Sequence, residues 1–155
     1  MGLTIGHLHV RRSTLIGASP SRVWREFSSE DRIGAWFGQG HTLHTFEPKL
    51  GGKVEMSVEY DFGEGPERRG YGGRVIAWEP EREVSAEINW RKPHDWPVPM
   101  LWTIRLTSLY DETMVEIFHH GFERLGRSAG AELEGYEEGW TNRHLKTLRQ
   151  IAEAK

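Results

Sequence analysis

The chain has 155 residues, a formal net charge of −3 and no cysteine, and it fits one ordinary domain spanning residues 1–155. The small negative charge argues against nucleic acid as a partner, and the lack of cysteine excludes a disulfide framework and a thiolate zinc site. No apolar stretch reaches the length of a membrane span and the N-terminus has no signal-peptide pattern, so we expect a cytoplasmic protein with no membrane partner.

The first part of the chain predicts a strand followed by two short helices. Apolar residues alternate along residues 8–16, with Arg12 as an interruption, which is typical of a strand. Ser19 followed by a proline is a common helix start, so a short helix is expected over residues 20–27. A second short helix is expected over residues 28–37, after which glycines end it.

The middle of the chain predicts six further strands. The alternation of apolar and polar residues is clearest over residues 53–60, which indicates a strand with one buried and one wet face. A loop containing three prolines separates the fifth strand of the chain from the sixth. The six segments are residues 41–47, 53–60, 69–78, 84–90, 102–106 and 113–120.

From about Ser128 the apolar period changes to that of a helix. One stripe at three- and four-residue steps consists of Leu133, Tyr136, Trp140, His144, Leu148 and Ile151. This stripe predicts a single long helix, the longest element of the chain. Seven strands, two short helices after the first strand and one long final helix predict an α+β fold with a curved antiparallel sheet.

Six local patterns stand in order along nearly the whole chain. They are Ala18-Ser19-Pro20 with Val23-Trp24, Trp36-Phe37, Pro48 to Lys53, Gly73-Arg74-Val75 with Trp78-Glu79-Pro80, Thr113 to His119 with Gly121-Phe122, and Tyr136 to Trp140. Together they resemble the SRPBCC (START/Bet v 1-like) superfamily, in its branch related to the activator of heat-shock-protein ATPase. The resemblance implies the helix-grip fold, in which the sheet wraps around the last helix and many members hold an apolar or amphipathic small molecule between them.

The chain departs from the family pattern in two places. The family commonly has an aliphatic residue where this chain has His144, so a titratable ring is expected to face the grip. The eukaryotic cochaperone also has a separate N-terminal domain that supplies most of its chaperone contact, and 155 residues leave no room for it. A chaperone contact through the outer sheet face stays an alternative, as does a homodimer formed by exposed edge strands.

Aromatic rings and two histidines make up the candidate ligand-binding set. Its members are Trp36, Phe37, Tyr60, Tyr71, Trp78, Trp90, Trp102, His119, Trp140 and His144. Aromatic walls with a few polar tips offer large contact area at low entropic cost, which fits a small hydrophobic or aromatic ligand. We interpret Trp24 and Trp96 instead as packing or surface residues.

His119 and His144 are expected on opposite walls of the cavity. Each is interpreted either as a core histidine with a hydrogen bond, as a group that orients a polar part of the ligand, or as the general base of a cyclase-like or hydrolase-like enzyme. The pair His41 and His44 forms no recognised metal motif. We therefore expect a small-molecule-binding protein, assign no catalytic residue, and expect no metal and no cofactor.

Overall fold

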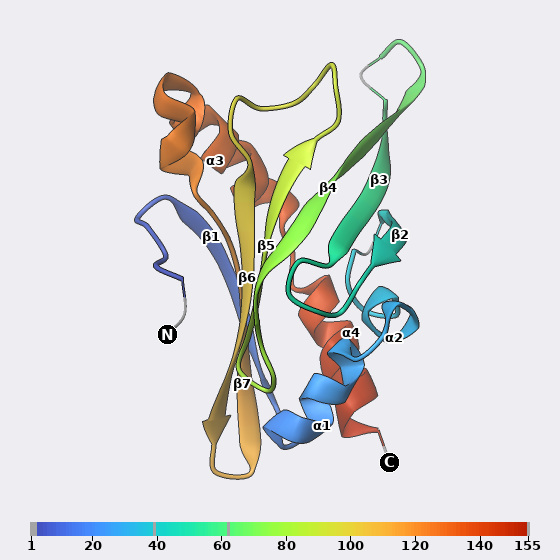
Figure 1. Cartoon of the computed structure of the whole chain (residues 1–155), viewed down its shortest axis with the longest axis vertical. Coiled ribbons are helices and arrows are strands. Elements are labelled where there is room, and N and C mark those ends of the chain that lie inside the picture. The colour runs from blue at the N-terminus through green and yellow to red at the C-terminus, as the bar shows by residue number, and fades with distance from the viewer. Residues whose placement is uncertain (1–2, 39, 62, 155) are drawn as a thin grey trace.

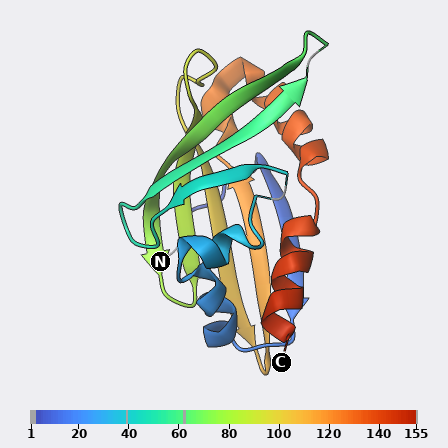
Figure 2. The same ribbon diagram turned by 90° about the vertical axis from the view of Figure 1, so that its right-hand side faces the viewer.

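The computed structural model describes residues 3–38, 40–61 and 63–154, which form one seven-stranded antiparallel sheet with helices packed on one face (Figures 1 and 2). The strands are β1 (His9–Ile16), β2 (Thr42–Phe46), β3 (Lys53–Asp61), β4 (Pro66–Glu79), β5 (Glu83–Trp90), β6 (Met100–Leu109) and β7 (Glu112–His120). They lie in the order β1-β7-β6-β5-β4-β3-β2. The α+β fold class and the antiparallel sheet predicted from the sequence are confirmed.

The two short helices predicted after the first strand are present, and a serine caps each of them. The helical elements are α1 (Pro20–Trp24), η1 (Arg25–Phe27), α2 (Glu30–Gly34), η2 (Phe122–Ser128), α3 (Ala129–Gly139) and α4 (Arg143–Glu153). The hydroxyl oxygens of Ser19 and Ser29 accept hydrogen bonds from backbone N–H groups in the first turns of α1 and α2. No helix within the described residues is long and apolar enough to cross a bilayer.

The single long C-terminal helix predicted from the sequence is wrong, because the structure has two helices there. α3 ends at Gly139, Trp140 has extended backbone angles (φ −76°, ψ 127°), and α4 begins after Asn142. The guanidinium of Arg12 donates hydrogen bonds to the carbonyl oxygens of Glu137 and Trp140, at 2.8 and 3.0 Å. These carbonyls lie where the helical hydrogen bonds stop, so Arg12 replaces partners that a continuous helix would supply. The longest element is therefore a strand, β4.

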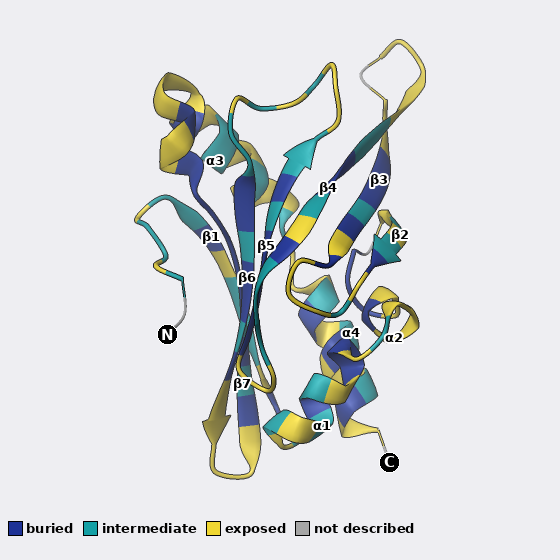
Figure 3. Ribbon diagram, in the orientation of Figure 1, coloured by how far each residue is buried: buried dark blue, intermediate teal, exposed yellow. Residues whose placement is uncertain are grey.

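Two apolar clusters lie between the sheet and the helices. Figure 3 shows buried residues on both the strands and the helices. The larger cluster contains residues of α1, α2 and α4, including Val23, Ile33, Leu145 and Leu148. The smaller cluster lies against α3 and consists of Val10, Met100, Phe122, Leu125 and Ala129. Trp140, at the break between α3 and α4, packs against both clusters. The helical break thus marks the boundary between the two parts of the core.

The sheet curves around the helices, and its backbone has local features that permit this curvature (Figure 2). Register shifts interrupt the pairing of β2 with β3 and of β4 with β5. A Cβ atom at Gly73 would lie 1.8 Å from the carbonyl oxygen of Glu87 on β5, so only glycine allows this close approach. The curved sheet gives the concave face that the helices cover.

Candidate functional site

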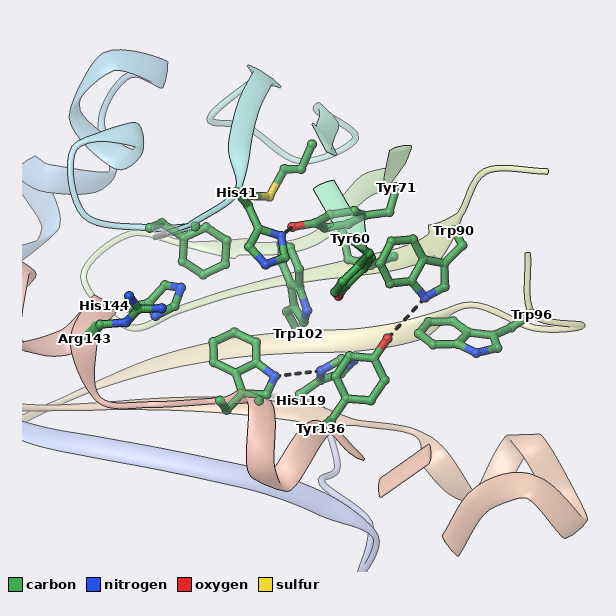
Figure 4. Close-up of a pocket in the computed structure, with 16 residues that line it drawn as sticks. His41, Tyr60, Tyr71, Trp90, Trp96, Trp102, His119, Tyr136, Arg143 and His144 are labelled. Atoms are coloured by element: carbon green, nitrogen blue, oxygen red, sulfur yellow. Dashed lines mark hydrogen bonds between the residues drawn. The ribbon is translucent and has the colours of Figure 1, made fainter. Parts of the chain in front are cut away.

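A cavity of about 280 Å³ lies between the inner face of the sheet and the C-terminal helices (Figure 4). It is lined by Phe37, Gly38, His41, Met56, Tyr60, Tyr71, Ile88, Trp90, Trp96, Trp102, His119, Tyr136, Gly139, Trp140, Arg143 and His144. These residues come from the loop after α2, from strands β3 to β7, from the proline-containing loop before β6, and from the region of the α3–α4 break. Segments far apart in sequence therefore converge on one space.

The strand register explains why the sheet residues converge. Met56 of β3 lies opposite Tyr71 of β4, which in turn lies opposite Trp90 of β5. Trp102 of β6 lies directly opposite His119 of β7. Side chains that pair across neighbouring strands project from the same face, so this register places all five on the concave side.

Nine side-chain rings form a closed circuit around the cavity, each in contact with the next. In order, this aromatic circuit is Phe37, Trp102, Tyr71, Trp90, Trp96, Tyr136, His119, Trp140, His144 and again Phe37. Neighbouring ring centroids are 4.6–6.2 Å apart, with interplanar angles between 41° and 80°. The rings meet at tilted or edge-to-face angles, which aromatic pairs generally prefer, and all nine line the cavity.

Two hydrogen bonds within the aromatic circuit join the helical side of the cavity to the sheet. The indole N–H of Trp90 donates to the hydroxyl of Tyr136 at 3.1 Å. The indole N–H of Trp140 donates to Nδ1 of His119 at 3.0 Å. An indole N–H can only donate, so Nδ1 of His119 is an acceptor and the neutral ring carries its proton on Nε2. These bonds fix the position of the helical wall of the cavity relative to the sheet.

The cavity histidines are neutral at pH 7. Burial, helped by the neighbouring His120, lowers the pKa of His119 to about 3. Burial also lowers the pKa of His144 to about 4, with smaller contributions from His41 and Arg143. The pKa of His41 is lowered in the same way, first by burial and then by Arg143. Each ring therefore offers one N–H donor and one lone pair.

Some buried polar atoms of the cavity residues lack hydrogen bonds. Within the described residues, Nε2 of His119 and Nδ1 of His144 are buried and have no hydrogen-bond partner. His41 is better satisfied, because its Nδ1 lies 2.5 Å from the hydroxyl of Tyr71. Burial raises the pKa of Tyr71, so this hydroxyl keeps its proton. Nε2 of His119 and Nδ1 of His144 therefore lack the hydrogen bonds that buried polar atoms normally make.

Eight of the ten residues predicted as ligand-binding line this cavity, and Trp36 and Trp78 do not. Trp36 is fully buried, and its indole N–H donates to the carbonyl oxygen of Glu26, which directs it into the core. Trp78 packs against Trp24 with ring centroids 5.0 Å apart. Both rings thus serve packing between the short helices and the sheet.

Trp96, interpreted from the sequence as a packing or surface residue, packs against the smaller core cluster and also lines the cavity. Asn89 explains this position, because its side-chain amide makes two hydrogen bonds to the backbone of Trp96 in the proline-containing loop. Its Nδ2 donates to the carbonyl oxygen of Trp96, and its Oδ1 accepts from the N–H of Trp96. The loop therefore folds back and sets the Trp96 ring beside Trp90, 6.2 Å away.

Sequence reasoning also left other lining residues out of the candidate set. Tyr136 shares the helical stripe of Trp140 and His144, and Met56 shares the inward parity of Tyr60, so signals existed for these two. Arg143 gave no signal, because a charged residue beside the apolar stripe is ordinarily a solvated one.

The described residues contain no group of three or more His, Cys, Asp or Glu side chains that is arranged to hold a metal ion. The chemistry of the cavity is therefore that of aromatic surface, neutral imidazoles and one guanidinium. Such a site holds a molecule by apolar contact and by a few directed hydrogen bonds.

Comparison with solved structures places this fold among known ones. The chain is similar to a crystal structure of a protein from Mycobacterium smegmatis, with a TM-score of 0.70 and 14% identity, covering 99% of this chain and 98% of that one. A crystal structure from Chromobacterium violaceum gives a TM-score of 0.65 at 20% identity, covering 95% and 99%. The solution structure of the Aha1 dimer from Colwellia psychrerythraea gives 0.59 at 14% identity, covering 94% and 96%. At these identities the likeness shows the fold alone.

Sequence comparison identifies the family. No curated protein sequence matches this chain. The family model described as Activator of Hsp90 ATPase homolog 1-like protein matches residues 17–153, most of the chain. The resemblance inferred from the six local patterns is thus confirmed, and the chain belongs to the Activator of Hsp90 ATPase homolog 1-like family of the SRPBCC superfamily.

Proposed function

We propose that this protein binds a small, flat, apolar molecule in the cavity between the sheet and the C-terminal helices. The observation that carries the proposal is the aromatic circuit, which surrounds a hollow of about 280 Å³. This volume lies near the lower end of the range of roughly 300–1,000 Å³ found for ligand pockets, so it suits a molecule of one or two fused rings.

Apolar burial alone supplies only part of the affinity that such a site needs. An aromatic body that buries roughly 200 Å² gains about 5 kcal/mol at about 25 cal/mol per Å². Before any cost of ordering the ligand, that energy corresponds to a dissociation constant of about 0.2 mM. A tighter ligand must therefore also use polar groups of the cavity wall.

The histidines of the cavity support a binding role over base catalysis. Nδ1 of His119 already accepts the indole N–H of Trp140, so the lone pair that a general base would use is occupied. The low pKa values of His119 and His144, about 3 and about 4, make both rings weak bases at neutral pH. The proposal therefore assigns both rings to the wall of the binding site and not to base catalysis.

The proposal is tested with N-phenyl-1-naphthylamine, a neutral apolar fluorophore, and the affinity is read from its own emission. Wild-type protein is expected to bind it, and Trp102→Ala is expected to weaken binding by about tenfold because one wall of the circuit is lost. Trp24→Ala is the matched control, because Trp24 stacks on Phe27 at 4.9 Å and does not line the cavity. Absence of binding to the wild type, or equal weakening in both variants, would contradict the proposal.

Contact with the chaperone Hsp90 is a second candidate, and the family match favours it. A partner surface outside the cavity predicts that wild-type protein and Trp102→Ala associate with Hsp90 equally well. The measurement is sedimentation velocity of each protein mixed with Hsp90 at micromolar concentration. If neither protein co-sediments with Hsp90, this candidate is rejected, and the ligand-binding proposal is unaffected.

A further inference from the structure

One end of the cavity carries a positive charge that no acidic side chain of the described residues balances. Among the lining residues that the structure describes, Arg143 is the one permanently charged side chain, and none is Asp or Glu. The ion pairs made by the described residues do not include Arg143. Its Nε lies 3.4 Å from the hydroxyl oxygen of Thr141, a neutral group. The guanidinium is therefore open to an anionic partner.

Two neutral histidines lie at the same end of the cavity. Figure 4 shows Arg143 and His144 together, with His41 between them and Tyr71. Because the Nδ1 of His41 is engaged with the Tyr71 hydroxyl, its other ring nitrogen is left for the cavity side. Nδ1 of His144 is buried without a partner among the described residues. Arg143 and these imidazoles together offer several N–H donors and no carboxylate.

The start of α4 adds to the positive electrostatic potential at this end of the cavity. Arg143 and His144 are the first two residues of α4, where the helix dipole places partial positive charge and where acidic residues are normally favoured. The first turn of α4 contains no acidic residue, and the N-cap residue Asn142 makes no side-chain capping bond. A cation at this position is unfavourable unless an anion accompanies it.

The other end of the cavity is apolar. Trp90, Trp96 and Tyr136 close it, and the indole N–H of Trp90 is already used by the Tyr136 hydroxyl. A bound molecule therefore meets aromatic surface at this end and a guanidinium at the other. The overall net charge of −3 repels anions in general, so any preference for an anion must come from local groups such as Arg143.

Building on the proposed function, we infer that the occupant of the cavity is an aromatic carboxylate. Its carboxylate group lies against the Arg143 guanidinium, beside His41 and His144, and its flat body lies within the aromatic circuit. A guanidinium matches the planar carboxylate with two parallel N–H···O bonds, which a neutral amide cannot reproduce. The charged group is thus recognised at the mouth, where Arg143 is exposed, and the apolar body is buried behind it.

The test compares 2-naphthoate with 2-naphthamide, which share one ring system and differ in the charge of the head group. Calorimetric titration at pH 7.5 is expected to give naphthoate about tenfold higher affinity, the value of one charge-assisted hydrogen bond. Arg143→Gln is expected to remove this preference by lowering naphthoate affinity to the level of naphthamide. Lys146→Gln is the matched control, because it removes one positive charge from an exposed position of α4 outside the cavity.

The possible results separate this inference from the proposed function. If the two naphthyl compounds bind equally, or if Arg143→Gln and Lys146→Gln lose the preference to the same extent, the carboxylate inference is overturned and the cavity remains a binding site. If N-phenyl-1-naphthylamine binds but naphthoate does not, the inference is likewise overturned. If none of the three probes binds, both the carboxylate inference and the proposed function are rejected.

Discussion

Acidification should destabilise this protein through two adjacent buried histidines. His119 and His120 are 4% and 1% exposed and point to opposite faces of the sheet. On the inner face, Nδ1 of His119 accepts the indole N–H of Trp140, and on the outer face Nε2 of His120 lies 2.7 Å from Oγ1 of Thr103. Burial lowers the pKa of His119 to about 3 and that of His120 to about 4, with nearby charges adding to the effect.

The direction and size of this effect follow from proton linkage. The pKa of each histidine is near 6.5 in the unfolded chain and lower in the folded protein, so below pH 6.5 the unfolded state binds more protons. The contribution of the two histidines to the free energy of unfolding is therefore fully present above about pH 6.5 and is lost as the pH drops toward about 4. At pH 5, about 1.5 pH units below the unfolded pKa, each histidine reduces the free energy of unfolding by about 2 kcal/mol. Together they remove about 4 kcal/mol from a total of typically 5–15 kcal/mol.

The assay is urea unfolding followed by tryptophan fluorescence at pH 7.5 and pH 5.0. His119→Asn keeps a polar atom near Nδ1, and His120→Gln keeps one near Nε2, so each variant retains a hydrogen-bonding group without the titration. Each variant is expected to lose about 2 kcal/mol less than wild type between the two pH values. His7→Gln, at an exposed position, is the control and should lose as much as wild type. If both buried variants lose as much free energy of unfolding between the two pH values as wild type does, the reasoning is refuted.

Three further predictions concern side chains that hold the helices and a loop in place around the sheet. Arg12→Met should lower the free energy of unfolding by about 1–3 kcal/mol in urea titration, because the carbonyl of Trp140 loses a charged donor, and no change would contradict its role at the break. Asn89→Ala should release the loop that holds Trp96 and weaken N-phenyl-1-naphthylamine binding with a smaller effect on stability; unchanged affinity would argue against this role. Ser19→Ala should cost about 1 kcal/mol of stability and leave probe affinity unchanged, because it removes only a helix cap.

The sequence predicted the strands because the alternation of apolar and polar residues follows the two faces of the sheet, although Ser57 is buried and Tyr60 is exposed against this pattern. Residues 53–60 alternate strictly, and Val54 and Met56 are buried in β3 as their parity predicts. The interruption at Arg12 had a cause that periodicity could not reveal. Its side chain occupies an inward position of β1 because it binds the carbonyls of the α3–α4 break, which is a contact between opposite ends of the chain.

The helical break escaped prediction because the apolar stripe runs through it. Tyr136, Trp140 and His144 keep a four-residue spacing whether the helix is continuous or broken, so the stripe gave no sign of the break. Local signals existed at Gly139 and Asn142, since glycine destabilises the interior of a helix and asparagine is common at the N-cap. The hydrophobic pattern outweighed them, although the break is what places Trp140 between the two parts of the core.

The cavity set was largely predictable because parity and helical stripe identify inward-facing rings. They do not distinguish rings that line a hollow from rings that fill the core, and this is why Trp36 and Trp78 were included. Trp96 and Arg143 depend on loop conformation and on the exact start of a helix, which are settled by tertiary contacts. Composition and period therefore indicate most of the cavity wall, and tertiary contacts determine which residues stand at its two ends.

The most direct test of a binding site between sheet and helices is to locate a bound probe by methionine-methyl NMR. Met56 lines the cavity, whereas Met100 belongs to the smaller core cluster and Met114 lies on β7 outside the cavity wall. Titration with N-phenyl-1-naphthylamine is expected to shift the Met56 methyl signal by the ring current of the probe and to leave those of Met100 and Met114 in place. Shifts of Met100 or Met114 with Met56 unchanged, or no shift at saturating probe, would contradict the account.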